Sequence, residues 1–317
     1  MSLAVLNSVF DSIKKNNIEK PGWSLYLLSV VPSRDECANY SCRQTILQPE
    51  GILEQFVNEL VQKYCKSDGL SAKYTCISEY DGTADECTIY KLQKDNQLIK
   101  SEYENFVSAI ANPDVEADAT TFKSAYVITG RVNLGNNKLS LKLVSMQNPI
   151  TNFSNKYKFA FWHESGEFSK IKDDVLSLTK KIDVIIAGDI VYFLSLDGEK
   201  LFNMERAYKK VCEYTVKEFE TCDFITSFEN FKKVATSGFN PKRFVSFNTE
   251  RLRVLSLDKK MRQTMAIQFN IPIDKSGKFD ATTDETSEKI VKLLCNKGMV
   301  DPFKKLPVEV TSARRWQ

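Results

Sequence analysis

A long β-hairpin in the middle of the chain constrains the fold most strongly. Residues 122–149, FKSAYVITGRVNLGNNKLSLKLVSMQNP, read as two strands with a Gly-Asn-Asn turn at residues 135–137. Glycine and asparagine tolerate the positive φ that such a tight turn requires. Strand-like sequence continues in residues 156–164 and 181–202. The sequence therefore predicts an antiparallel β-meander.

Helical periodicity takes over after these strands. Residues 204–220, 227–235 and 286–298 each place apolar side chains at the spacing of one helix face. Strands followed by helices favour α+β architecture over an alternating parallel sheet. The sequence therefore predicts an α+β fold with a helical C-terminal part.

The N-terminal third predicts a further α/β region. Residues 23–31 read as a buried strand, and a helix is expected to end at Pro113. The polar, acidic residues 114–121 are the expected boundary. We predict an N-terminal α/β region over residues 1–118, acidic towards its end, and a C-terminal domain of meander and basic helices over residues 119–317.

Nothing in the sequence predicts a membrane span or a signal peptide. No run approaches the ~20 apolar residues that a span needs, and Leu6, Val9 and Phe10 fit one face of an N-terminal helix better. We therefore expect a cytoplasmic protein. The eight cysteines include no Cys-x-x-Cys pair and accompany a single histidine. Reduced thiols are the favoured interpretation, with a cysteine-bound metal as the alternative.

The charges of this nearly neutral chain are segregated. It has 44 basic and 41 acidic side chains. Residues 79–118 contain ten acids and three lysines, whereas residues 232–262 contain nine basic side chains and two acids. Such segregation indicates a positive patch for a polyanion or two surfaces that attract each other. A solvated helix face and neutralisation within the molecule are the alternatives.

The basic segment, residues 240–262, is expected to be helical. We expect Asn240 to cap the start of a helix, because its side chain can accept from free amides. One face collects the apolar side chains Val254, Leu257, Met261 and Met265. The candidate DNA-binding residues are basic side chains of this region and of the C-terminus: Lys232, Lys233, Lys242, Arg243, Arg251, Arg253, Lys259, Lys260, Arg262, Arg314 and Arg315.

Catalytic motifs are missing from the sequence, so we favour a protein that is not an enzyme. The phosphate-binding, dinucleotide and serine-hydrolase signatures do not occur. The only histidine, His163, reads as a packed strand residue rather than a general base. No cofactor or metal is predicted. One catalytic alternative stays open, a Mg²⁺-dependent nuclease using Asp183 or Asp189, although Asp189 precedes a strand in a typical turn position.

Residues 181–203, KIDVIIAGDIVYFLSLDGEKLFN, together with the following YKKVCEYTVKEF, resemble the KwaB family of the Kiwa anti-phage defence system. The resemblance extends through SFENFKKVA into NPKRFVSFNTERLRVLS and covers roughly residues 122–296. No residue in these motifs is catalytic by type.

The resemblance implies a DNA-binding effector without established enzymatic chemistry. It also implies a small membrane-spanning partner, KwaA, that recruits the protein to the inner membrane, and restraint of phage DNA replication and late expression. Together with the charge pattern, this predicts sequence-independent binding of double-stranded DNA by a homodimer or higher homo-oligomer. The rival hypotheses are the Mg²⁺-dependent nuclease and an oligomeric interaction module that does not bind DNA.

Overall fold

The computed structural model of the chain describes part of its 317 residues. The described residues are 3–20, 22–62, 64, 74–77, 80, 88–115, 124–147, 161–164, 167–170, 176–247, 249–295, 297–300 and 306–309. For residues 161–170, 246, 249–251, 254, 299, 300 and 309 within these ranges, at most the backbone is described.

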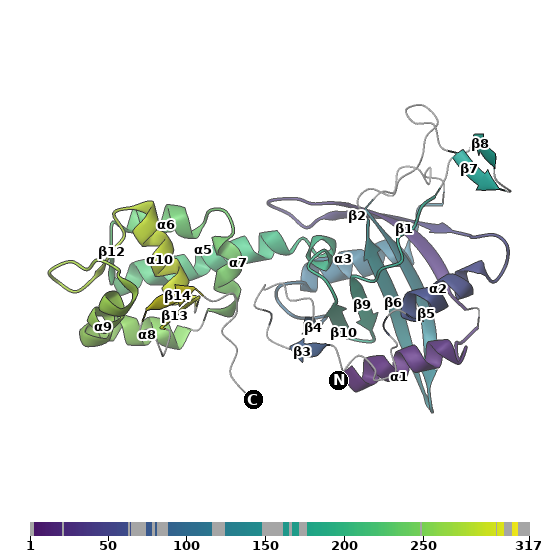
Figure 1. Cartoon of the computed structure of the whole chain (residues 1–317), viewed down its shortest axis with the longest axis horizontal. Helices are drawn as coiled ribbons and strands as arrows, with labels where there is room; N and C mark the ends of the chain where they lie inside the picture. Colours follow the sequence, from purple (N-terminus) through teal and green to yellow (C-terminus); the bar gives the residue numbers. More distant parts are fainter. Residues whose placement is uncertain are drawn as a thin grey trace. The chain divides into compact units, whose positions relative to one another are not determined.

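The chain forms two compact units (Figure 1). The first unit contains Met1–Ser78 and Asp85–Met204. The second contains Glu79–Ala84 and Glu205–Gln317. The domain boundary predicted at residues 118–119 lies outside the described residues and stays a prediction.

The first unit is built on an eight-stranded sheet with the order β2-β1-β5-β6-β9-β10-β4-β3. Its strands are β1 (Ser24–Val31), β2 (Asn39–Thr45), β3 (Thr75–Ile77), β4 (Thr88–Gln93), β5 (Ala125–Leu134), β6 (Asn137–Met146), β9 (Val184–Ala187) and β10 (Ile190–Phe193). Pairing is antiparallel except between β3 and β4. Because β5, β6, β9 and β10 are successive antiparallel neighbours, the predicted meander is confirmed for these four strands. The strand Phe161–Glu164, within the predicted residues 156–164, does not belong to this sheet.

The central hairpin closes as predicted. Leu134 faces Asn137 across the β5–β6 turn, and Gly135 there has a φ of 64°, which glycine adopts without steric cost. The strands β7 (Phe161–Glu164) and β8 (Glu167–Lys170) pair with each other in a separate hairpin.

Both faces of the sheet are covered by apolar side chains. Helices α1 (Leu3–Lys14) and α2 (Ile52–Gln62) contribute to one core cluster with Tyr126 and Tyr192 of the sheet. The next residue along β10, Phe193, points to the opposite face and contacts Phe202, as alternation along a strand requires. Phe106 of helix α3 (Lys100–Ala111) also contacts Phe202, which directly follows helix α4 (Gly198–Leu201). The predicted N-terminal amphipathic helix is confirmed by the buried side chains of α1.

The second unit is mainly helical and has its own core. Its elements are α5 (Met204–Cys222), α6 (Phe228–Ala235), α7 (Asn240–Arg243), the 3₁₀ turn η3 (Phe244–Ser246), α8 (Thr249–Leu257), α9 (Lys259–Phe269) and α10 (Asp284–Leu294), with the short strands β11 (Ile225–Thr226), β12 (Phe279–Asp280), β13 (Gly298–Val300) and β14 (Pro307–Glu309). Phe219 lies at the centre, with its ring 5.1–6.0 Å from four other phenylalanine rings. The presence of these helices and of a mostly antiparallel sheet in one chain confirms the predicted α+β class.

Candidate nucleic-acid interface

The basic segment forms a corner between two helices rather than one continuous helix. Helix α8 ends at Leu257, and Asp258 adopts an extended conformation with φ −100° and ψ 93°. The Asp258 carboxylate accepts the backbone N–H of Met261 at 2.9 Å and so caps α9. We call residues 257–261 the α8–α9 corner.

The helix break changes which side chains are buried. Leu257 is 77% exposed and Met261 39% exposed. The predicted apolar face through Leu257 and Met261 is therefore wrong at these two positions, because it assumed an uninterrupted helical wheel. The interruption at Asp258 turns both side chains to the surface.

Arg262 holds the two helices of the corner together. It is 8% exposed, and its Nε donates to the carbonyl oxygen of Gly277 at 2.9 Å. Its Nη1 donates to the carbonyl of Ser256 at 3.0 Å and also to that of Leu255. These are carbonyls at the C-terminal end of α8, where a cation satisfies free acceptors and the negative end of the helix dipole. Arg262 is therefore a structural clamp in this fold.

Three predicted cations point outward around the corner: Arg253, Lys259 and Lys260. We call them the corner cations. The first turn of α9 contains no acidic side chain, so two lysines stand at the positive end of a helix dipole, where cations are unfavourable by roughly 0.3–1 kcal/mol each. The Asp258 carboxylate at the cap offsets part of this positive charge, and the three corner cations still leave a net positive charge on this surface.

Lys232 and Lys233 form a separate pair of exposed cations on α6. Lys233 lies 3.4 Å from the exposed carboxylate of Asp284. Figure 1 shows α6 on the other side of α5 and α10 from α8 and α9, and all five helices contribute side chains to one core cluster. The predicted basic residues thus divide over two surfaces of the second unit.

The NPKR sequence of α7 is used inside the second unit. Arg243 Nη1 donates to Glu288 Oε1 and to Asn240 Oδ1, each at 2.5 Å. Asn240 is the first residue of α7 rather than its cap, because its amide donates to the carbonyl of Val234 and to Glu288 instead. The prediction that Asn240 caps the helix is therefore wrong.

Lys242, the remaining polar residue of the NPKR sequence, is 8% exposed. Its Nζ lies 5.7 Å from the ring centroid of Tyr208 and 5.5 Å from that of Phe239, within cation–π range. Of the remaining candidates, the side chain of Arg251 and the whole of Arg314 and Arg315 lie outside the described residues.

The Glu288 contacts predict a pH-dependent stability. Burial alone would raise the pKa of Glu288, but hydrogen bonds from Asn240 and Arg243 and the positive charge of Arg243 outweigh it and lower the pKa below 4.5. A lowered folded-state pKa stabilises the fold above the unfolded value and loses that stabilisation as the pH falls through the folded value. We expect the stability difference between the wild type and Glu288→Gln to be present at pH 7 and to shrink below about pH 4.5 in urea denaturation. A difference that is constant between pH 7 and pH 3 would contradict this account.

Residues 124–300, more than half of the chain, match the family model described as Kiwa protein KwaB-like. The chain belongs to the KwaB-like family. Membership makes it a component of Kiwa anti-phage defence. No curated protein and no solved structure matches the chain. The KwaB-like match spans the meander of the first unit and the α8–α9 corner of the second.

The two carboxylates considered for a nuclease, Asp183 and Asp189, form hydrogen bonds or ion pairs with other residues of this KwaB-like chain. Asp183, 1% exposed, accepts the Met146 N–H at 2.8 Å and the Ser195 hydroxyl at 2.5 Å, and lies 3.2 Å from Lys181 Nζ. Asp189 lies in the turn that follows the other end of β9, and it pairs with Lys94 at 2.7 Å. The described part of the chain contains no group of three or more His, Cys, Asp or Glu side chains that could hold a metal ion.

The buried cysteines Cys42 and Cys212 lack the features of a reactive thiol. Six of the eight lie among the described residues, and all six are free thiols. Burial raises the pKa of Cys42 and of Cys212 to about 12, so neither is a thiolate at neutral pH. His163 lies on β7, where only the backbone is described.

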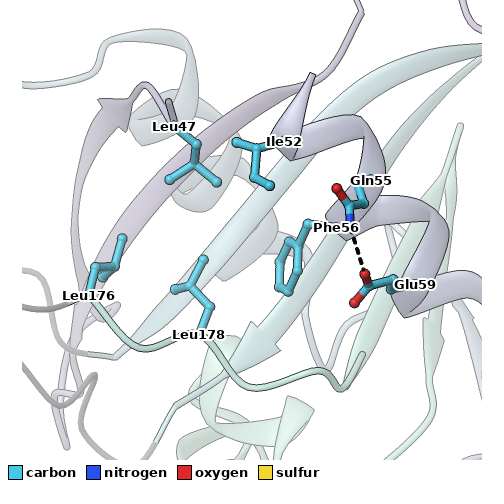
Figure 2. Close-up of a pocket in the computed structure, with 7 residues that line it drawn as sticks. All are labelled: Leu47, Ile52, Gln55, Phe56, Glu59, Leu176 and Leu178. Carbon is cyan, nitrogen blue, oxygen red and sulfur yellow. Dashed lines mark hydrogen bonds between the residues drawn. The ribbon is translucent and has the colours of Figure 1, made fainter. Parts of the chain in front are cut away.

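The first unit of the KwaB-like chain has an apolar surface pocket of about 270 Å³ beside α2 (Figure 2). Its walls are Leu47, Ile52, Phe56, Leu176 and Leu178. Its two polar residues are engaged with each other, since Gln55 donates to Glu59 at 3.2 Å, and Glu59 also pairs with Lys180. The pocket therefore presents no catalytic pair.

Among the described residues, no helix combines the length and the apolar content that crossing a bilayer requires.

Proposed function

We propose that the chain is a non-enzymatic, largely sequence-independent double-stranded DNA-binding effector of Kiwa defence. The corner cations Arg253, Lys259 and Lys260 would contact phosphates. The observation that carries the proposal is the set of three exposed cations around the α8–α9 corner, which outnumber its one acid, the cap residue Asp258. Phosphate contacts supply most of non-specific DNA affinity and require no base-reading side chains.

The structure refines which predicted residues are proposed as contacts. Lys242, Arg243 and Arg262 have their polar groups directed to the fold, so we propose for them a role in shaping the surface. Lys232 and Lys233 on α6 would extend the DNA path only for a duplex that also follows the second surface.

Charge reversal at the corner tests the proposal. Lys259→Glu together with Lys260→Glu is expected to weaken binding of a fluorescently labelled duplex by about tenfold per lysine near 0.1 M salt. The charge-matched control is Lys15→Glu with Lys20→Glu, two exposed lysines of the first unit, which we expect to leave the affinity unchanged. Equal losses in the two variants would reject the corner as the binding surface.

Changing Lys232 and Lys233 to glutamate measures how much the surface of α6 contributes to the affinity for the duplex. Retained affinity would confine the DNA to the corner, and a comparable loss would extend the path over α6. Sedimentation of each variant reports on the proposed homodimer or higher oligomer.

We further propose that a membrane-spanning partner subunit recruits this protein to the inner membrane, as the family resemblance implies. DNA held there would be unavailable for replication and expression. Co-expression with the partner, followed by membrane flotation, tests this part, and a protein that stays away from the membrane fraction would contradict it.

The nuclease alternative has less support than binding. Asp183 and Asp189 stand at opposite ends of a strand, and the Asp183 carboxylate accepts hydrogen bonds from the fold. A two-carboxylate metal site requires both groups at one cation. Incubation of plasmid with Mg²⁺ and with EDTA distinguishes the hypotheses, because cutting that requires the metal would favour the nuclease.

A further inference from the structure

The α8–α9 corner exposes apolar side chains between its cations. Leu257 is 77% exposed and Met261 is 39% exposed. Lys259 and Lys260 stand between them in the sequence, and Arg253 stands one helical turn before Leu257. A single exposed leucine on a helix needs no explanation. Two large apolar side chains within five residues, set among three cations, form a surface that simple solvation does not explain.

The backbone of the corner is also held by hydrogen bonds within the protein. Asp258 caps α9 through the Met261 N–H, and Arg262 binds carbonyl groups of both the α8 terminus and Gly277. The stem of Lys259 packs on Gly277, where an added Cβ would lie 2.8 Å from Lys259 Cε. Leu257 is therefore presented on a backbone whose hydrogen bonds are made within the protein. A backbone held in this way loses little conformational freedom when its side chain enters a binding site.

The surrounding charge selects the partner. The only acid in the corner is Asp258, and its carboxylate is engaged in the cap. An apolar side chain flanked by cations complements a polyanion with an apolar interior, and duplex DNA combines phosphates outside with stacked bases inside. DNA-bending proteins insert leucine, isoleucine or methionine between base steps in this manner.

We propose that Leu257, with Met261 beside it, is an apolar wedge that enters between neighbouring base pairs while Arg253, Lys259 and Lys260 hold the phosphates around that step. This inference rests on the proposed DNA-binding function and names how the same surface engages the duplex. A wedge responds to how easily base pairs unstack rather than to base edges. Binding is therefore independent of sequence but bends the DNA and favours duplexes that are already weakened.

The test combines two measurements on the full chain. Energy transfer between dyes at the two ends of a duplex reports bending, and competition between a matched duplex and one with a central mismatch reports the preference for weak stacking. The wild type is expected to raise the energy transfer and to prefer the mismatched duplex by roughly tenfold, since the unstacking cost is lowest there. Leu257→Ala is expected to abolish both effects while the salt dependence of binding stays unchanged.

Ile267→Ala is the matched control. Ile267 is 81% exposed on helix α9 but lies nearly two turns beyond the corner, so its variant is expected to bend DNA like the wild type. Because both side chains are exposed, both variants should keep the wild-type circular dichroism spectrum.

Three results would overturn the wedge. Unchanged bending by Leu257→Ala would reject it while leaving DNA binding intact, whereas a wild type that binds no duplex would reject the proposed function as well. Loss of self-association, or of binding to vesicles of anionic lipid, in Leu257→Ala with normal DNA bending would assign Leu257 to a protein or lipid contact instead.

Discussion

Arg262→Ala is expected to lower the free energy of unfolding by about 3 kcal/mol, because it removes a buried cation that donates to three carbonyl groups. The carbonyls at the end of α8 and of Gly277 would lose a charged donor in a site where Arg262 is only 8% exposed. Urea denaturation followed by circular dichroism measures the loss. Hydrogen exchange of α8 and α9 locates it.

The geometry of the guanidinium group predicts the order of stability of the Arg262 variants. Arg262→Lys keeps the charge but has no fork of donors to reach both helices, so we expect it to recover only part of the stability. Lys260→Ala is the control of equal charge change, and its exposed side chain predicts an effect within about 0.5 kcal/mol. If Arg262→Ala were as stable as Lys260→Ala, the clamp would not hold the corner.

Asp183→Asn is expected to destabilise the first unit by about 3 kcal/mol or more. The carboxylate accepts from the Met146 N–H and the Ser195 hydroxyl and pairs with Lys181. An amide of the same size removes the charge and places an N–H group against these donors. The measurement is the urea midpoint of the first unit.

Asp189→Asn is the paired control, because Asp189 forms an exposed ion pair with Lys94. Such pairs contribute about 0–1 kcal/mol. A nuclease role predicts the opposite pattern, in which both variants lose DNA cleavage and neither changes stability. That pattern would replace the structural role of Asp183 with a catalytic one.

The local patterns of the sequence predict the fold better than the site. The β5–β6 hairpin follows from strand-forming residues around a Gly-Asn turn, and α1 follows from the spacing of its apolar side chains. Both features depend on residues that are close in the sequence, so they can be predicted from a single sequence. The parallel pairing of β3 with β4 could not be predicted in this way. The segment between the two strands includes Glu79–Ala84, which belongs to the second unit, so the pairing depends on contacts distant in the sequence.

The basic surface depends on contacts that composition does not contain. Arg243 pairs with Glu288, 45 positions away, and Arg262 binds Gly277. A count of charges along the sequence cannot distinguish these arginines, whose side chains bind within the protein, from the exposed Lys260. The helix break has a local signal, since Asp258 is a good cap residue before Lys259. Weighing that signal against the apolar wheel would have predicted an exposed Leu257.

The salt dependence of duplex binding tests the central claim most directly. If the corner cations hold phosphates, the logarithm of the binding constant should fall with the logarithm of salt concentration with a slope of about −2.7, near −0.9 for each of three contacts. Lys259→Glu with Lys260→Glu should reduce the slope to about −0.9. A slope that is the same in the wild type and this variant, or an affinity that does not depend on salt, would contradict a DNA-binding role for the corner.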